Sequence, residues 1–188
     1  ARFVEDPWQR DPSDASTHLR GGGRTRILRD GAVFEQAGIG FSDVSGTQLP
    51  PSATAARPEL AGASWRAVGV SLVFHPRNPY LPTTHANVRH FRAERDGKTV
   101  AWWFGGGSDL NPCLEVAADT AHFHAVQKAH LDRHDADLYP RLKAWADEYF
   151  YIPHRGRARG VGGIFLDDHS SGDWVADFAL IQDIGRAF

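Results

Sequence analysis

The stretch VGVSLVFHPRNPYLPTTHANVR, residues 68–89, decides the fold because it contains two predicted strands and the connection between them. Its first part, residues 68–74, is rich in β-branched residues, which favours a buried strand over a helix. Three prolines follow, and each fixes φ and removes a backbone donor, so we expect a stiff connection. The second strand begins at His85.

Three polar side chains of this second strand, those of His85, Asn87 and Arg89, alternate along the chain. An extended backbone places alternate side chains on the same face of a sheet. Arg89 could hold a carboxylate through two parallel bonds, Asn87 could donate and accept, and His85 could serve as a base. The set predicts a strand-end site for an anionic ligand, whereas each residue alone is more typical of a solvated strand face.

The rest of the chain predicts further strands and three helices. Asp30-Gly31 is a hairpin signal, Asp96-Gly97 ends another strand, and Asp173 is a plausible N-cap for the last helix. The expected strands cover residues 25–34, 37–44, 65–74, 85–94, 99–104 and 161–166, and the first two helices cover residues 115–130 and 136–149. A turn-rich connection with a short helical start is expected at residues 50–62. This order indicates an α+β fold built on a meander of antiparallel strands.

Length and composition indicate one soluble globular domain over residues 1–188, with 41% apolar and 23% charged residues. Prolines and three consecutive glycines make residues 1–23 a predicted mobile segment. The net charge of −2 provides no general attraction for nucleic acid or an anionic membrane, and no apolar run is long enough to span a bilayer. Cys113 is the only cysteine, so no internal disulfide can form, and we expect a cytoplasmic protein.

Glycines 105–107 follow the strand predicted to end at Phe104, and we expect them to leave Asp109 exposed at a strand end. Asp167 and Asp168 end another predicted strand and are candidate general acids or bases. Cys113 has no partner that spacing can identify, and no Gly-x-Ser-x-Gly motif is present.

The chain has ten histidines, and four of them lie at or near the ends of predicted elements: His75, His85, His124 and His154. Together they could bind a divalent metal, although no HExxH or CxxC spacing supports a metal site. A histidine-ligated metalloenzyme, an oxygenase or a hydrolase, is therefore one candidate function.

Long motifs narrow the choice: GVSLVFHPRNPYLPTTHANVRHF, WWFGGGSDLNP, DEYFYIPHRGRARGVGGIFLDD and SATAARPELAG. They resemble the oxygen-dependent coproporphyrinogen III oxidases of haem biosynthesis, and the resemblance extends over nearly the whole chain from Phe3. It implies that two propionates of coproporphyrinogen III are converted to vinyl groups by dioxygen, with release of carbon dioxide and hydrogen peroxide and without an organic cofactor. It also implies a broad antiparallel sheet flanked by helices on both faces, and a homodimer.

The same resemblance assigns roles to individual residues. His85 matches a general acid or base, Asp109 matches a carboxylate thought to hold pyrrole N–H groups, and Arg159 matches an arginine implicated in activity. Substrate-contacting positions match Ser71, Asn87, Val88 and Arg89. The family's possible metal ligands, for which manganese is one candidate metal, correspond in this sequence to His75, His85, His124 and His154.

Two departures from the family pattern stand out. Cys113 and Leu114 replace the aromatic residues that commonly follow GGGxDLxP. The chain also has no methionine and ends inside a helical pattern, so we expect it to be a piece of a longer protein, truncated at the C-terminus and at the N-terminus. If 188 residues were the whole polypeptide, we would expect no turnover, and an inactive porphyrin-binding fragment is the remaining alternative.

Overall fold

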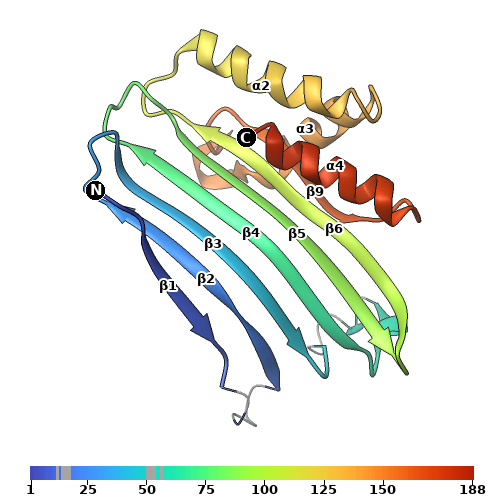
Figure 1. Ribbon diagram of the computed structural model, residues 1–188. Coiled ribbons are helices and arrows are strands. Elements are labelled where there is room, and N and C mark those ends of the chain that lie inside the picture. Colours follow the sequence, from blue (N-terminus) through green and yellow to red (C-terminus); the bar gives the residue numbers. More distant parts are fainter. Residues whose placement is uncertain (12, 14–17, 50–53, 56) are drawn as a thin grey trace.

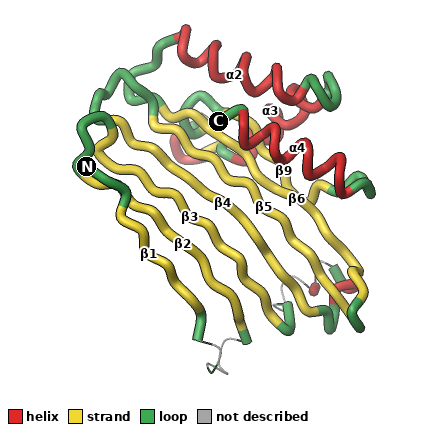
Figure 2. Tube along the Cα trace, viewed as in Figure 1, coloured by secondary structure: helices red, strands yellow, loops and turns green. Residues whose placement is uncertain are grey.

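The structure is a computed structural model that describes residues 1–11, 13, 18–49, 54–55 and 57–188. Within these residues, seven strands form one antiparallel sheet in the spatial order β1-β2-β3-β4-β5-β6-β9 (Figures 1 and 2). The strands are β1 (Val4–Gln9), β2 (Leu19–Arg29), β3 (Phe34–Gly46), β4 (Ser64–Pro76), β5 (Thr83–Arg95), β6 (Lys98–Asn111) and β9 (Gly163–His169). The predicted α+β class and the antiparallel meander are confirmed.

The helices gather around β6 and β9, and β1 to β4 extend away from them (Figure 1). The helices are α2 (Ala117–Leu131), α3 (Leu138–Tyr149) and α4 (Trp174–Arg186). Short elements are the 3₁₀ turns η1 (Pro58–Leu60) and η2 (Pro153–Arg155), with the strand pair β7 (Tyr151–Ile152) and β8 (Arg157–Ala158). Asp173 caps α4 as predicted, because its carboxylate accepts from the backbone N–H groups of Val175 and Ala176. None of the described helices is both long and apolar enough to cross a membrane.

The main core lies between α2, α3, α4 and one face of β6 and β9. Its buried members are Phe104, Leu131, Leu138, Leu142, Ile164, Leu166, Leu180, Ile181 and Ile184. Phe165 points to the opposite face of β9 from Ile164, and there it stacks on Tyr149 and contacts Trp145 edge-on, both from α3. Helices therefore contact both faces of the sheet, as predicted, but at its β9 edge.

Residues 4–9 and 19–23 of the predicted mobile segment lie in paired strands. β1 pairs with β2 from Val4 opposite Ile27 to Gln9 opposite Gly22, and only residues 12 and 14–17 lie outside the described part. Pro7 is compatible with β1 because β1 is the outermost strand, where a missing backbone donor breaks no inner ladder. In the expected connection at residues 50–62, η1 confirms the short helical start, whereas residues 50–53 and 56 lie outside the described part.

The strand predicted to end at Phe104 continues through the three glycines to Asn111. β5 pairs with it on one side, and β9 pairs with it on the other from Phe104 opposite His169 to Asp109 opposite Gly163. Pairing on both sides supplies the hydrogen bonds that keep a glycine-rich segment extended. Asp109 therefore lies in a part of β6 that is paired on both sides, two residues before the strand ends.

Candidate functional site

The alternation predicted for β5 is confirmed by the hollow beside it. His85, Asn87 and Arg89 line one hollow of about 330 Å³, next to Ser71 on the neighbouring strand β4, which pairs with Asn87. The other lining residues come from β6, α3, β9 and the segment after β8, and they are Gly106, Gly107, Tyr149, Phe150, Arg159 and Phe165. One polar face of the sheet and one aromatic wall thus enclose the candidate site.

A buried carboxylate lies directly behind this hollow. The side chain of Asp109 has no solvent exposure, and its Oδ1 lies 2.9 Å from Nδ1 of His85. Its Oδ2 accepts from Asn111 Nδ2 at 2.6 Å and from Arg159 Nε at 3.0 Å. Two residues that line the hollow, His85 and Arg159, are therefore held by one anchoring side chain.

Burial pushes the pKa of Asp109 upward, but hydrogen bonds from His85 and Asn111 and the charge of Arg159 outweigh it, so the net pKa lies below the ordinary value. The carboxylate is ionised at neutral pH and can only accept hydrogen bonds. Nδ1 of neutral His85 must therefore carry the proton that faces Asp109, which leaves Nε2 with a free lone pair. This is the arrangement of a general base.

Arg89 is held in place without a substrate. Its Nη1 donates to Asn87 Oδ1 at 2.8 Å, and its Nη2 lies 2.9 Å from Asp167 Oδ2. Both Arg89 and Asp167 keep more than a third of their side-chain surface exposed, so an incoming anion can reach the guanidinium. Gly105 makes room for this pair, because a Cβ there would lie 2.5 Å from Asp167 Oδ1 and 2.8 Å from Arg89 Nε.

Arg159 is fixed from three directions. Its side chain pairs with Asp109, its guanidinium lies over the ring of Phe150 at 4.4 Å, and its backbone N–H donates to the carbonyl of Phe150 at 2.9 Å.

The sequence had singled out Arg159 through the resemblance alone. It did not single out Asn111, Phe150 or the pairing of Asp167 with Arg89. The role of Asn111 could have been predicted, because its two-residue spacing from Asp109 places both side chains on one face of a strand.

Two predicted site residues need correction. Asp109 is fully buried and both its oxygens are engaged, so it does not offer a free carboxylate to the hollow. The side chain of Val88 points to the other face and packs against the core around Phe104, so only the backbone of Val88 is on hand for a substrate in the hollow. The predicted location near a strand end fits His85, the third residue of β5, and Asp109, the third residue from the end of β6. Asn87 and Arg89 lie further inside the paired part of β5.

The four candidate metal-binding histidines do not form a cluster. In the described part of the chain, no three His, Cys, Asp or Glu side chains come together in a group that could hold a metal ion. His75 lies 3.3 Å from the hydroxyl of Thr83, and His85 is bonded to Asp109. His124 contacts the Val161 carbonyl and the Tyr139 hydroxyl, both at 3.0 Å.

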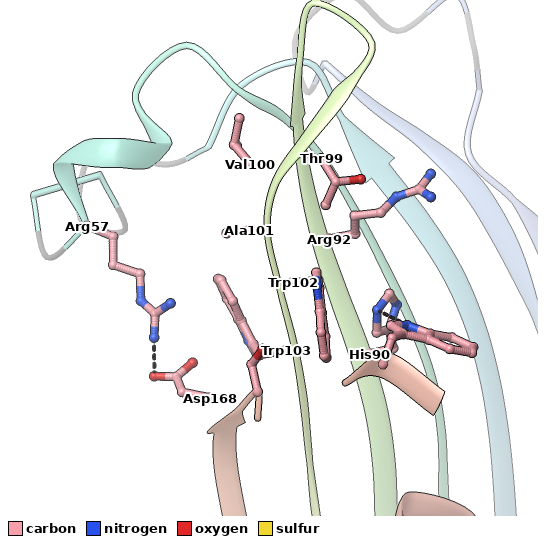
Figure 3. A pocket seen from close by; sticks show the side chains of 11 residues that line it. Arg57, His90, Arg92, Thr99, Val100, Ala101, Trp102, Trp103 and Asp168 are labelled. Carbon is pink, nitrogen blue, oxygen red and sulfur yellow. Dashed lines mark hydrogen bonds and ion pairs between the residues drawn. The ribbon is translucent and has the colours of Figure 1, made fainter. Parts of the chain in front are cut away.

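A larger hollow of about 690 Å³ lies around the other part of β6 (Figure 3). There Arg57 pairs with Asp168 at 2.6 Å and lies over the ring of Trp103 at 4.2 Å. On its other side, Trp174 donates to His90, whose pKa is lowered by burial and by the charges of Arg92 and Arg66. It includes Asp168, which is paired with Arg57, but none of the residues that the resemblance assigns to catalysis or substrate binding. The smaller hollow is lined by five of those residues, namely Ser71, His85, Asn87, Arg89 and Arg159, and is therefore the candidate site.

The site therefore offers a guanidinium for an acidic group, a histidine held as a base, and an aromatic wall for a flat, apolar body. Comparison with known protein families gives a match that covers the whole chain. The family described as Coproporphyrinogen III oxidase matches residues 1–188. The chain belongs to the coproporphyrinogen III oxidase family.

Proposed function

We propose that this protein is an oxygen-dependent coproporphyrinogen oxidase, which oxidatively decarboxylates two propionates of coproporphyrinogen III to vinyl groups and yields protoporphyrinogen IX. Membership of the family supports a role in haem biosynthesis with coproporphyrinogen III as substrate. In each step, one propionic acid side chain and one dioxygen give one vinyl group, one carbon dioxide and one hydrogen peroxide. Dioxygen accepts the two electrons, so the proposal requires no organic cofactor.

Arg89 is proposed to bind the propionate that reacts. Its guanidinium lines the hollow and is partly exposed, and a carboxylate can form two parallel bonds with it. The propionate would take the place of Asp167, whose carboxylate contacts Nη2 at 2.9 Å without substrate. Asn87 would keep the other side of the guanidinium oriented through its bond to Nη1. The propionate side chain is thus held at a defined position relative to His85, which lies on the same face of β5.

His85 is proposed as the base that removes a pyrrole N–H proton. The ionised Asp109 holds the Nδ1 proton, so Nε2 is the nitrogen that can accept one. Loss of that proton makes the electron-rich porphyrinogen easier to oxidise, and the protein then has to orient the ring and one arm. With both of its oxygens engaged, Asp109 is assigned a positioning role, which replaces the expected direct contact with pyrrole N–H groups.

One observation carries the proposal: Arg89 and His85 line the same hollow, and His85 is hydrogen-bonded to Asp109. The chain that contains this hollow matches the family over residues 1–188. The test is product analysis with coproporphyrinogen III in the full-length protein, in air and without dioxygen. We expect vinyl product in air only, with two hydrogen peroxides per protoporphyrinogen. Arg89→Gln and His85→Ala should lose activity, whereas Arg141→Gln, an exposed arginine outside the hollow, should not.

Equal rates of vinyl formation with and without dioxygen would refute the oxygen dependence. Absence of vinyl product under both conditions would refute the oxidase assignment itself. We also propose that the protein acts as a homodimer, on the basis of the resemblance, and sedimentation equilibrium of the full-length protein tests that part separately.

A further inference from the structure

A second hollow adjoins the candidate site and has a different character. It encloses about 290 Å³ between the end of β6 and the β7–β8 hairpin. Arg155, Arg157 and Arg159 line it, and Glu115 is the only carboxylate among its lining residues. Arg159 also lines the candidate site, so one guanidinium joins the two hollows.

The hairpin presents these arginines through its own backbone. η2 ends at Arg155 and is followed by Gly156, whose φ of +62° lies in the left-handed region that glycine adopts without strain. β7 and β8 then pair, with Ile152 opposite Arg157. The bond from the Arg159 N–H to the Phe150 carbonyl closes the loop. The three side chains are therefore positioned by a hydrogen-bonded turn.

The charges in this hollow are not balanced. In the part of the chain that the structure describes, neither Arg155 nor Arg157 makes an ion pair, and neither contacts Glu115. Arg89 in the candidate site and Arg57 in the larger hollow each have a carboxylate partner. Two unpaired guanidinium groups in a concave site favour an anion with two acceptor oxygens.

We propose that this second hollow is a carboxylate subsite, in which Arg155 and Arg157 bind another acidic arm of the same tetrapyrrole whose reacting arm is held by Arg89. The inference rests on the proposed function, because a substrate with four carboxylates is what allows one molecule to engage both hollows. Arg159 lies between them and pairs with Asp109, so occupation of the second hollow aligns the ring over the His85 side of the first.

The chain has its own reporter for this subsite. Cys113 is its only cysteine, it is exposed, and it lines the second hollow. A ligand arm in that hollow must shield the thiol from alkylation. The rate of iodoacetamide labelling, read on the peptide that contains Cys113, measures this one position.

The experiment compares coproporphyrin III, a stable tetracarboxylate, with deuteroporphyrin, a dicarboxylate, by fluorescence titration of the full-length protein. The variants are Arg155→Gln/Arg157→Gln, Arg89→Gln and the control Arg141→Gln. Labelling of Cys113 is followed with and without each porphyrin. Inorganic phosphate serves as a competitor, which tests whether any small anion fills the subsite.

We expect Arg155→Gln/Arg157→Gln to weaken coproporphyrin binding by about fivefold, the effect of losing two partly exposed ion pairs, with less effect on deuteroporphyrin. Coproporphyrin should slow Cys113 labelling in the unmodified protein and not in this variant. Porphyrin binding that depends on Arg89 but not on Arg155 and Arg157, with unprotected Cys113, would overturn the subsite alone. Protection by phosphate equal to that by coproporphyrin would overturn the assignment to a substrate arm. No binding of either porphyrin to the unmodified protein would overturn the proposed function as well.

Discussion

Asp109→Asn tests the central relation in the site, namely that a buried carboxylate holds His85 as a base. An amide at this position can donate to Nδ1, which would shift the proton of neutral His85 to Nε2 and block proton acceptance there. General-base catalysis contributes about 10²–10⁴-fold, so we expect kcat for vinyl formation to fall by at least about 100-fold. The change keeps side-chain size and burial nearly constant.

The same substitution should also destabilise the fold. Asp109 accepts from His85, Asn111 and Arg159, and hydrogen bonds to a charged group contribute about 1.5–3 kcal/mol each. The amide oxygen can still accept from Asn111 and Arg159, so we expect a loss of about 3 kcal/mol in the free energy of unfolding. For a chain of this size that lowers Tm by roughly 6–12 °C, which urea titration and calorimetry both measure.

The pH dependence supplies an independent check. The pKa of Asp109 is lower in the folded chain than its ordinary value of 3.8, so its contribution to stability is complete above that value and is lost as the pH falls below it. Asp109→Asn should remove this part of the acid sensitivity. Asp183→Asn is the matched control, because Asp183 is another mostly buried carboxylate, bonded to His134 at 2.9 Å away from the site. It should lower stability without lowering kcat, and normal kcat in Asp109→Asn would refute the reasoning.

Three further substitutions separate binding from folding. Arg89→Lys removes the planar fork and should raise KM by about tenfold with unchanged stability, and an unchanged KM would contradict carboxylate binding there. Gly105→Ala inserts a Cβ 2.5 Å from Asp167 Oδ1, so it should displace the Arg89 pair and also raise KM, whereas Gly97→Ala in the β5–β6 turn should not. Asp173→Ala removes the cap of α4 and should cost about 1 kcal/mol in thermal unfolding with normal turnover, and loss of turnover would show that the helix contributes to the site.

Local signals in the sequence predicted the sheet and one face of the site. Alternation along β5 grouped His85, Asn87 and Arg89, and the structure brings these three into one hollow. This worked because a strand has a side-chain period of two wherever it is placed, so the grouping needs no knowledge of neighbouring elements. The cap at Asp173 was predictable for the same reason, since the bonds lie within three residues.

The errors arose where a distant segment decides the outcome. The glycines before Asp109 indicated a strand end by composition, but β9, more than 50 residues later, pairs with that segment and buries the carboxylate. Likewise, pairing with β2 makes a strand of residues 4–9 despite Pro7. Arg159 meets Asp109 across 50 residues, and no spacing rule connects them.

The alternation of β5 also limits how this protein can change in length. Even-numbered positions such as Val88 face the helix-covered core, while odd-numbered positions such as Asn87 and Arg89 face the open hollow. Adding or deleting one residue before Asn87 within the strand would exchange the two sets, bringing a guanidinium into the core and a valine to the ligand. Length variation among natural relatives should therefore be confined to the turns at either end of β5, where an extra residue leaves the strand in register.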